Sequence, residues 1–282
     1  MPGSLYVVAT PIGNLEDITL RALRVLREVA IIAAEDTRRT AKLLSHYSIS
    51  TPTTSVHAHN EHRRIQMLLD RLAAGDDVAL VSDAGTPGVS DPGRQVVAAA
   101  LERGFSVVAV PGPSAVVAAL VSSGFRMDSF LFAGFPPRRV KAREEWLRRL
   151  AEEPCSVIFF EAPHRIRETL SAAQPIFGIR PIAVAKELTK IHEKLVIGPT
   201  SDVLRVIAEP RGEYTIVVSP ASSGSGEILE LPEDRALLSE FGRLTDSTSL
   251  SRRDAVARLS ARYRMPQRQV YDAIERAKKS VG

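Results

Sequence analysis

Short apolar runs rich in β-branched residues alternate, over the first 120 residues, with longer stretches of helical character. The runs cover residues 5–10, 30–36, 78–83 and 106–112. Between them, residues 18–29 and 62–75 place apolar side chains three or four positions apart, which is the spacing of one helix face. Strands that alternate with helices of this length predict an α/β domain built on a mainly parallel sheet.

A second α/β region is expected further along the chain. A charged helix is predicted at about 140–153, and the strands at residues 128–135, 156–163, 181–188, 194–199 and 212–220. The last of these strands follow one another closely, so the second sheet should be partly antiparallel.

The chain is expected to have two α/β domains and a helical tail. The tail's two predicted short helices, joined by residues 262–266, resemble a helix-turn-helix. The segment before the tail is rich in Gly and Ser, as linkers are. We place an N-terminal α/β domain at 1–122, a C-terminal α/β domain at 123–222, the linker at 223–232 and the tail at 233–282.

Composition narrows the class of protein. With 282 residues and 44% hydrophobic content, the chain can form two modest cores. No apolar run approaches the roughly 18 to 20 residues of a membrane span, and no basic region precedes the first apolar stretch as in a signal peptide. A single cysteine, Cys155, excludes an internal disulfide and a cysteine-cluster metal site. We therefore expect a soluble cytoplasmic protein without membrane partners.

The net charge of +4 is concentrated in the tail. Residues 233–282 contain 11 basic and 7 acidic residues, whereas the first 232 residues are balanced. A basic tail on a neutral body indicates a polyanionic partner, nucleic acid before membrane. A solvated helical surface explains the same charges equally well. Four further basic residues follow a turn in the second domain and could meet phosphates: Arg138, Arg139, Lys141 and Arg143.

Three loops rich in Gly and Pro follow predicted strands, at residues 10–14, 82–93 and 111–114. None has the spacing of a dinucleotide-binding fingerprint or a phosphate loop. Loops at the carboxyl ends of strands are where open α/β sheets bind ligands, although 10–14 could equally be a plain turn. Within the second loop, Asp91 and Pro92 suit the cap and first position of a helix, so Asp91 needs no ligand. Residues 82–87 are more than a tight turn requires, which indicates a ligand there.

Seven motifs occur in a recognisable order: ATPIGNLEDIT, AAEDTRRTAKLL, HAHNE, VSDAGTPGVSDPG, VPGPSA, EAPHR and KELTKIHE. Together they resemble the small-subunit ribosomal RNA methyltransferases of the tetrapyrrole methylase superfamily (class III methyltransferases), over about residues 4–220 and again in the tail. The resemblance implies a two-domain fold with S-adenosylmethionine in a cleft between the domains. It also implies a homodimer that methylates a ribose 2′-hydroxyl of a cytidine in the decoding region of 16S rRNA, on assembled small subunits.

The resemblance also implies which residues hold the cofactor. Residues 82–87 stand where relatives carry a shorter Gly-Gly-Asp-Pro loop, so the register of Asp83 is open: it contacts the cofactor or only braces the loop. The implied cofactor-binding residues are Pro11, Ser82, Asp83, Ala84, Gly85, Thr86, Pro87, Ser114, Ala115, Glu161, Leu188 and Thr215.

Methyl transfer from a sulfonium is an in-line displacement, which the enzyme assists mainly by alignment. A ribose hydroxyl is a weak nucleophile, so a proton acceptor should help by roughly 10² to 10⁴. The polar groups expected on the substrate side of the first domain are Asp36, Arg38, His57 and Asn60, faced by Lys186 and Glu187 from the second. Which of them is the base, or whether one is needed, stays open.

Each candidate has a structural alternative. Asp36 or Thr37 can cap the following helix, and Asn60 the next one. Lys186 and Glu187 can pair with charged neighbours. His57 and His59 have no third ligand at a convincing spacing, so no metal site is predicted.

Two other functions compete with rRNA methylation. A methyltransferase acting on a corrinoid or porphyrin precursor would share the fold and cofactor, but would have no evident use for a basic helical tail. A non-catalytic RNA-binding assembly factor would keep the fold, but would not need the intact loop at residues 82–87.

Overall fold

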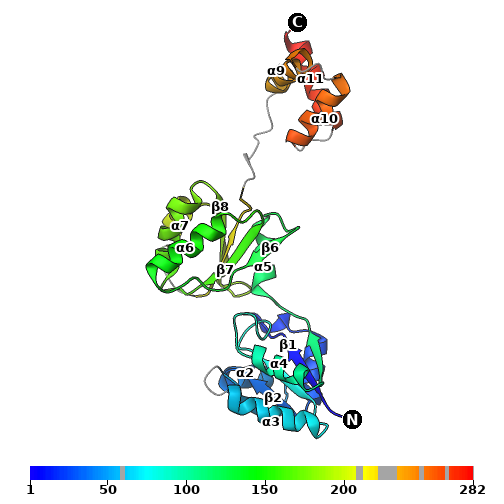
Figure 1. Cartoon of the computed structure of the whole chain (residues 1–282), viewed down its shortest axis with the longest axis vertical. Coiled ribbons are helices and arrows are strands. Elements are labelled where there is room, and N and C mark those ends of the chain that lie inside the picture. Colours follow the sequence, from blue (N-terminus) through cyan, green and yellow to red (C-terminus); the bar gives the residue numbers. More distant parts are fainter. Residues whose placement is uncertain (58–60, 208–211, 222–233, 248–250, 264–266, 282) are drawn as a thin grey trace. The chain divides into compact units, whose positions relative to one another are not determined.

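The computed structural model describes residues 1–57, 61–207, 212–221, 234–247, 251–263 and 267–281 (Figure 1). The chain forms two compact units, Met1–Ala221 and Ser222–Gly282. The predicted linker at 223–232 lies outside the described residues, as does Asn60. The predicted boundary between two α/β domains at residue 122 falls inside the first unit and stays a prediction.

The first sheet is entirely parallel, as predicted, with the strand order β3-β2-β4-β1-β5. Only β3 lacked a sequence signal, because its three residues are too few for a pattern. The strands are β1 (Ser4–Val8), β2 (Ile31–Ala34), β3 (Thr53–Ser55), β4 (Val78–Val81) and β5 (Ser106–Val110).

Helices cover both faces of this sheet. On one face, α1 (Leu20–Glu28) and α2 (Thr37–His46) bury their apolar sides, including Leu26 and Leu43. On the other, α3 (Glu61–Ala73) and α4 (Arg94–Glu102) do the same with Leu68 and Val96. Because both faces are covered, β2 and β4 are buried at every position and read as continuous apolar runs. A short 3-10 helix, η1 (Leu15–Asp17), follows the loop after β1.

The second sheet is mixed, with the order β6-β7-β10-β8-β9, which confirms the predicted partly antiparallel arrangement. Only the pair β6 and β7 is parallel. The strands are β6 (Phe130–Phe132), β7 (Ser156–Glu161), β8 (Pro181–Lys186), β9 (Lys194–Pro199) and β10 (Tyr214–Val218).

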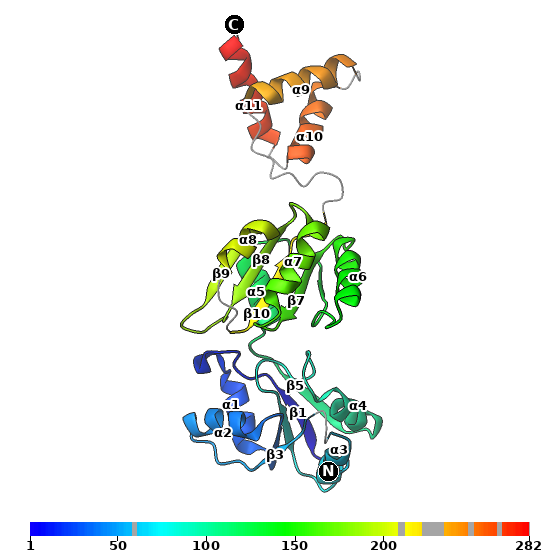
Figure 2. The ribbon, with the colours of Figure 1, turned by 90° about the vertical axis from the view of Figure 1, so that its left-hand side faces the viewer.

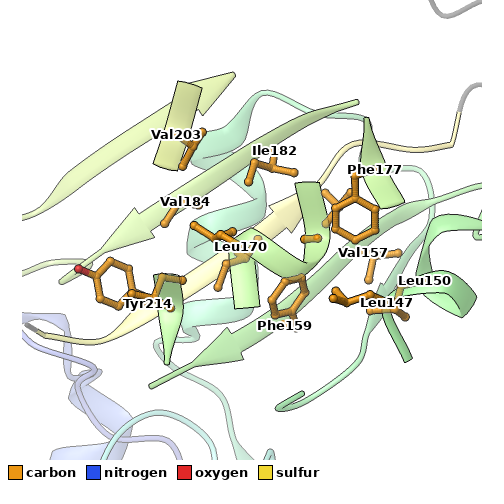
Figure 3. Close-up of a cluster of buried hydrophobic side chains, with 14 of the residues drawn as sticks. Leu147, Leu150, Val157, Phe159, Leu170, Phe177, Ile182, Val184, Val203 and Tyr214 are labelled. Atoms are coloured by element: carbon orange, nitrogen blue, oxygen red, sulfur yellow. The ribbon is translucent and has the colours of Figure 1, made fainter. Parts of the chain in front are cut away.

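Two apolar layers enclose the second sheet. On one face, α6 (Val140–Ala151), α7 (Ile166–Phe177) and α8 (Thr200–Val206) pack onto a core that includes Phe159 and Val184 (Figure 3). On the other face lies α5 (Ala115–Ser123), whose Val116, Ala119 and Leu120 contact residues of β7, β8 and β10. The helix that starts at the third Gly/Pro loop therefore packs against the second sheet.

The C-terminal unit is helical, as expected for the tail. It comprises α9 (Asp234–Ser247), α10 (Arg252–Tyr263) and α11 (Gln267–Val281) (Figure 2). The three helices share an apolar core that includes Phe241, Leu259 and Ile274. The Ser251 hydroxyl accepts a hydrogen bond from the Asp254 amide at 3.2 Å and so caps α10. Among the helices that the structure describes, none combines the length and apolar character needed to cross a bilayer.

Candidate active site

A cavity of about 350 Å³ opens within the first unit, a size that suits a small organic ligand. Its wall comes from the loops after β1 and β4, the start of α5, and the ends of β7 and β10. The lining residues are Ile12, Ala84, Gly85, Thr86, Val89, Ser90, Asp91, Ser114, Ala115, Val116, Phe135, Phe160, Glu161, Ala162, Pro163, Leu188, Glu213, Tyr214 and Thr215. None of these described residues is basic, so the cavity offers no cationic side chain to a phosphate.

The predicted ligand loop at residues 82–87 contributes its middle part to this wall. Gly85 pairs with Thr10 through two backbone hydrogen bonds of 2.9 and 3.0 Å, which tie the loops after β1 and β4 together. Gly85 has φ +75°, a left-handed conformation that favours glycine. Ala84, Gly85 and Thr86 line the cavity, whereas the remaining members of the predicted loop do not: Ser82, Asp83 and Pro87.

Asp83 braces the loop. Its carboxylate accepts a hydrogen bond from the Asp36 amide at 3.1 Å and pairs with Arg39 at 3.1 Å. The Ser82 hydroxyl is directed at the carbonyls of its own loop, Ala84 at 3.3 Å and Gly85 at 3.4 Å. These two residues therefore hold the conformation of the loop through contacts outside the cavity wall.

The other predicted cofactor residues lie at the cavity, with the exception of Pro11, which is buried outside its wall. Ser114 caps α5 by accepting a hydrogen bond from the Val117 amide, so the first amides of α5 are directed toward the cavity end of the helix. Glu161 is only 2% exposed, and its carboxylate is held by the Ala162 amide, the Thr169 hydroxyl and Arg165. Leu188 and Thr215 add apolar and hydroxyl surface.

The polar residues predicted on the substrate side of the first domain do not line the cavity. Asp36 caps α2 and accepts hydrogen bonds from the Arg38 amide and guanidinium, the alternative that the sequence left open. The hydrogen bonds from Arg38 hold the pKa of Asp36 well below its usual range. His57 follows β3, outside the cavity wall, and Asn60 lies outside the described residues.

Lys186 and Glu187 do not line the cavity either. Lys186 ends β8 and lies with Val184 and Lys194 around a separate hollow, its ammonium 5.9 Å from the Tyr214 ring centroid. Burial alone would raise the pKa of Glu187, but hydrogen bonds from Lys190 and the Glu213 amide outweigh it and lower that pKa. Glu187 thus pairs with a charged neighbour, as the structural alternative predicted.

The interpretation of Arg143 as a phosphate contact is wrong. Its side chain is 1% exposed, because it faces α7 and pairs with Glu168 at 2.5 Å. Arg138, Arg139 and Lys141 are exposed.

Asp91 does not cap α4. The residue before that helix is Gly93 at φ +116°, with no side-chain cap, and Asp91 instead lines the cavity. Sequence reasoning missed this because Asp-Pro reads as a helix start. The signal available was the preceding Gly-Val-Ser, in which Gly88 and Ser90 both adopt left-handed conformations.

Asp91 sits in an unfavourable electrostatic environment. Burial, together with the neighbouring carboxylates of Glu35 and Asp83, raises the pKa of Asp91 to about 6, although a hydrogen bond with Ser82 acts in the opposite direction. Burial likewise raises the pKa of Glu35. The ionised form of Asp91 is therefore disfavoured in the folded state.

This environment predicts a pH-dependent stability. Since the folded-state pKa exceeds the unfolded one, ionisation of Asp91 costs stability as pH rises from about 4 through 6, and the full cost persists above. Asp91→Asn should stabilise the protein by roughly 1 kcal/mol at pH 8, after allowance for solvent screening, and not at pH 4. Thermal melts at both pH values measure this, and a variant less stable at pH 8 would contradict it.

The fold and the cavity define a class: an α/β protein with a cavity of small-molecule size, lined by loops of a parallel and a mixed sheet and, among the described residues, by no basic side chain. The sequence model of the family Tetrapyrrole (Corrin/Porphyrin) Methylases matches residues 4–204. The methyltransferase CobJ has a similar fold, with a TM-score of 0.60 at 20% identity, covering 78% of this chain and 95% of that one. Uroporphyrin-III C-methyltransferase from Thermus thermophilus, complexed with S-adenosylhomocysteine, has a similar fold with a TM-score of 0.56 at 20% identity. The match covers 77% of this chain and 97% of that one.

Relatives of higher sequence identity share the name of one particular enzyme. Ribosomal RNA small subunit methyltransferase I of Synechocystis sp. is 44% identical over 277 residues, covering 95% of this chain and 96% of that protein. The protein of the same name from Bacillus subtilis is 40% identical over 96% and 94%. The chain therefore belongs to the tetrapyrrole methylase family and, within it, to the ribosomal RNA small subunit methyltransferase I group.

Proposed function

We propose that this protein transfers the methyl group of S-adenosylmethionine to a ribose 2′-hydroxyl of a cytidine in the decoding region of 16S rRNA. It acts on assembled small subunits, in the cytoplasm, as a homodimer. The observation that carries the proposal is the cavity built from the predicted loops, which presents carboxylates and, among the described residues, no basic side chain. Such a lining suits a cationic sulfonium and disfavours a nucleotide phosphate.

The cofactor prediction is confirmed at the level of the family, through the methyltransferase relatives and the S-adenosylhomocysteine complex of a structural neighbour. The residues present fit this group. Ile12, Leu188 and Phe160 provide apolar surface for a base, and the first amides of α5 can receive carboxylate or hydroxyl oxygens. When bound, the cofactor supplies an electrophilic methyl group on a positively charged sulfur.

The chain's own contribution is mainly alignment. The Thr10–Gly85 pairing fixes the loop that lines one side of the cavity, and Ser114 fixes the start of α5 on another. Reacting atoms held about 3 to 3.5 Å apart and in line need little further activation beyond removal of the hydroxyl proton.

An RNA substrate is supported by the relatives' name and by the exposed basic residues Arg138, Arg139 and Lys141. The basic tail adds to this charge. Contacts of this kind position a phosphate backbone and make binding depend on salt.

Two measurements test the proposal. Calorimetric titration with S-adenosylmethionine should show binding, and absence of heat at millimolar ligand would exclude both enzyme functions. Incubation with labelled cofactor and small subunits should label a cytidine ribose in 16S rRNA. Label found only on a corrinoid or porphyrin precursor would favour the second candidate, a tetrapyrrole methyltransferase, whose supporting observation is the shared fold.

Removing the helical unit should separate substrate binding from cofactor binding. Because Ser222–Gly282 is a compact unit with its own core, truncation after Ala221 should leave S-adenosylmethionine affinity unchanged. It should weaken small-subunit binding at least tenfold at physiological salt, since it removes 11 of the 37 Lys and Arg residues. Sedimentation binding assays measure this, and undiminished binding by the truncated protein would exclude the tail from substrate recognition.

A further inference from the structure

Three acidic residues line the cavity, and they differ in their partners. Glu161 is held by Arg165, Thr169 and the Ala162 amide. Glu213 is exposed and pairs with Lys190 at 3.1 Å. Among the described residues no basic side chain forms an ion pair with Asp91, whose hydrogen-bonding partner is Ser82. Asp91 is thus the lining carboxylate that forms no ion pair with any basic side chain that the structure describes.

The position of Asp91 works against the stability of the fold in several ways. An aspartate at the N-cap position stabilises a helix, yet Asp91 lies two residues before the N-cap of α4, which is Gly93 and provides no side-chain cap. Ser90 beside it adopts φ +66°, a left-handed conformation that is strained for a non-glycine residue. Glu35 and Asp83 add like charges. Local conflicts that nothing in the fold requires are typical of functional sites.

Other described groups are less suited to take a proton in the cavity. Asp36 is held by Arg38, Asp83 by Arg39 and Glu187 by Lys190. Glu35 has a raised pKa but does not line the cavity, and neither does His57.

We propose that Asp91 is the proton acceptor of the methyl transfer, an inference that rests on the proposed function. As the substrate oxygen forms its bond to the methyl carbon, the carbon–sulfur bond breaks and its electron pair stays on the sulfur, which becomes neutral. The hydroxyl proton passes to a carboxylate oxygen of Asp91 and from there to solvent. No oxidant or further reactant is needed.

The groups around Asp91 set its pKa and so its suitability as a proton acceptor. The groups that act on it are Glu35 and Asp83 at the ends of β2 and β4, and Ser82, with Glu161 and Glu213 in the same cavity. Burial and the two neighbouring carboxylates place the pKa of Asp91 at about 6, near the working pH, where a general base is most effective. The single-turnover rate should therefore rise with pH and level off above about 6.

The test measures single-turnover methyl transfer to small subunits at saturating S-adenosylmethionine, from pH 5 to 8, beside calorimetric binding of the cofactor. Asp91→Asn should lower the rate by roughly 10² to 10⁴ and abolish the inflection near pH 6, with cofactor affinity kept within about threefold. Asp91→Glu should restore part of the rate and the inflection. Asp202→Asn, at an exposed aspartate of α8, is the control and should match the wild type.

Three results would overturn the role of Asp91. They are an Asp91→Asn rate within threefold of wild type, an inflection that persists in that variant, and a loss of cofactor affinity that accounts for the whole loss of rate. The last would make Asp91 a ligand of the cofactor's positive charge. A wild-type protein that methylates no rRNA would instead overturn the proposed function, so the two failures are distinguishable.

Discussion

Gly85→Val should abolish measurable binding of S-adenosylmethionine, a loss of at least a hundredfold in affinity. Gly85 has φ +75°, where a β-branched residue is a genuine outlier, and an added Cβ would lie 3.5 Å from Ile12 Cγ2. Relieving this strain breaks the backbone pairing with Thr10 that holds both loops at the cavity. Calorimetric titration measures the affinity, and a circular dichroism melt measures the cost in stability.

Gly104→Val provides a matched control for this variant. Gly104 has φ +76°, and an added Cβ meets no atom within 4 Å. Its loop follows α4, outside the cavity wall. Both variants should therefore lose similar stability, whereas only Gly85→Val should lose cofactor affinity. Equal affinities in the two variants would refute the assignment of the cofactor to this cavity.

Gly13→Ala should lower S-adenosylmethionine affinity by about tenfold or more. Its Cβ would lie 2.9 Å from the Leu188 carbonyl oxygen, as well as 2.7 Å from Thr189 Oγ1 and 2.6 Å from Lys190 Cγ. Side chains can move, but the carbonyl can yield only if the backbone that positions Leu188 at the cavity shifts. The hydrogen bond from the Asn14 amide to Thr189 Oγ1, 3.0 Å long, should also be lost.

The control for this variant is Gly198→Ala in β9. That glycine also has no positive φ, and its added Cβ would meet the Asp202 Cβ at 3.9 Å, an ordinary contact. Its cofactor affinity should equal that of the wild type in the same titration. If Gly13→Ala also binds normally, the approach of residues 12–14 to 188–190 has no part in shaping the site.

The sequence alone predicted the two sheets, because each is built from elements with strong local patterns. The alternation of apolar runs and helical spacing over residues 5–112 gave a parallel sheet, and the close spacing of the last strands gave antiparallel pairs. The short strand β3 was not predicted, since three residues are too few to show the alternating pattern of a strand.

Loop composition located much of the cavity wall for a related reason. Gly and Pro record backbone constraints that are local, so Ala84, Gly85 and Thr86, and the start of α5 at Ser114 and Ala115, could be identified as lining candidates before the structure. The proposed ligand of these loops came from the family resemblance, since Gly and Pro spacing carries no information about ligand chemistry.

The tertiary structure decided which polar side chains face the cavity, because a side chain's direction depends on partners far along the chain. Arg143 is buried and pairs with Glu168, and Glu187 pairs with Lys190. Asp91, which the sequence predicts as a helix cap, does not have that role, because the N-cap of α4 is Gly93. The sequence by itself located the loop at residues 82–87, three of which line the cavity. Only the packing of β2, β4 and their loops placed Asp91, a carboxylate that forms no ion pair among the described residues, in the same wall.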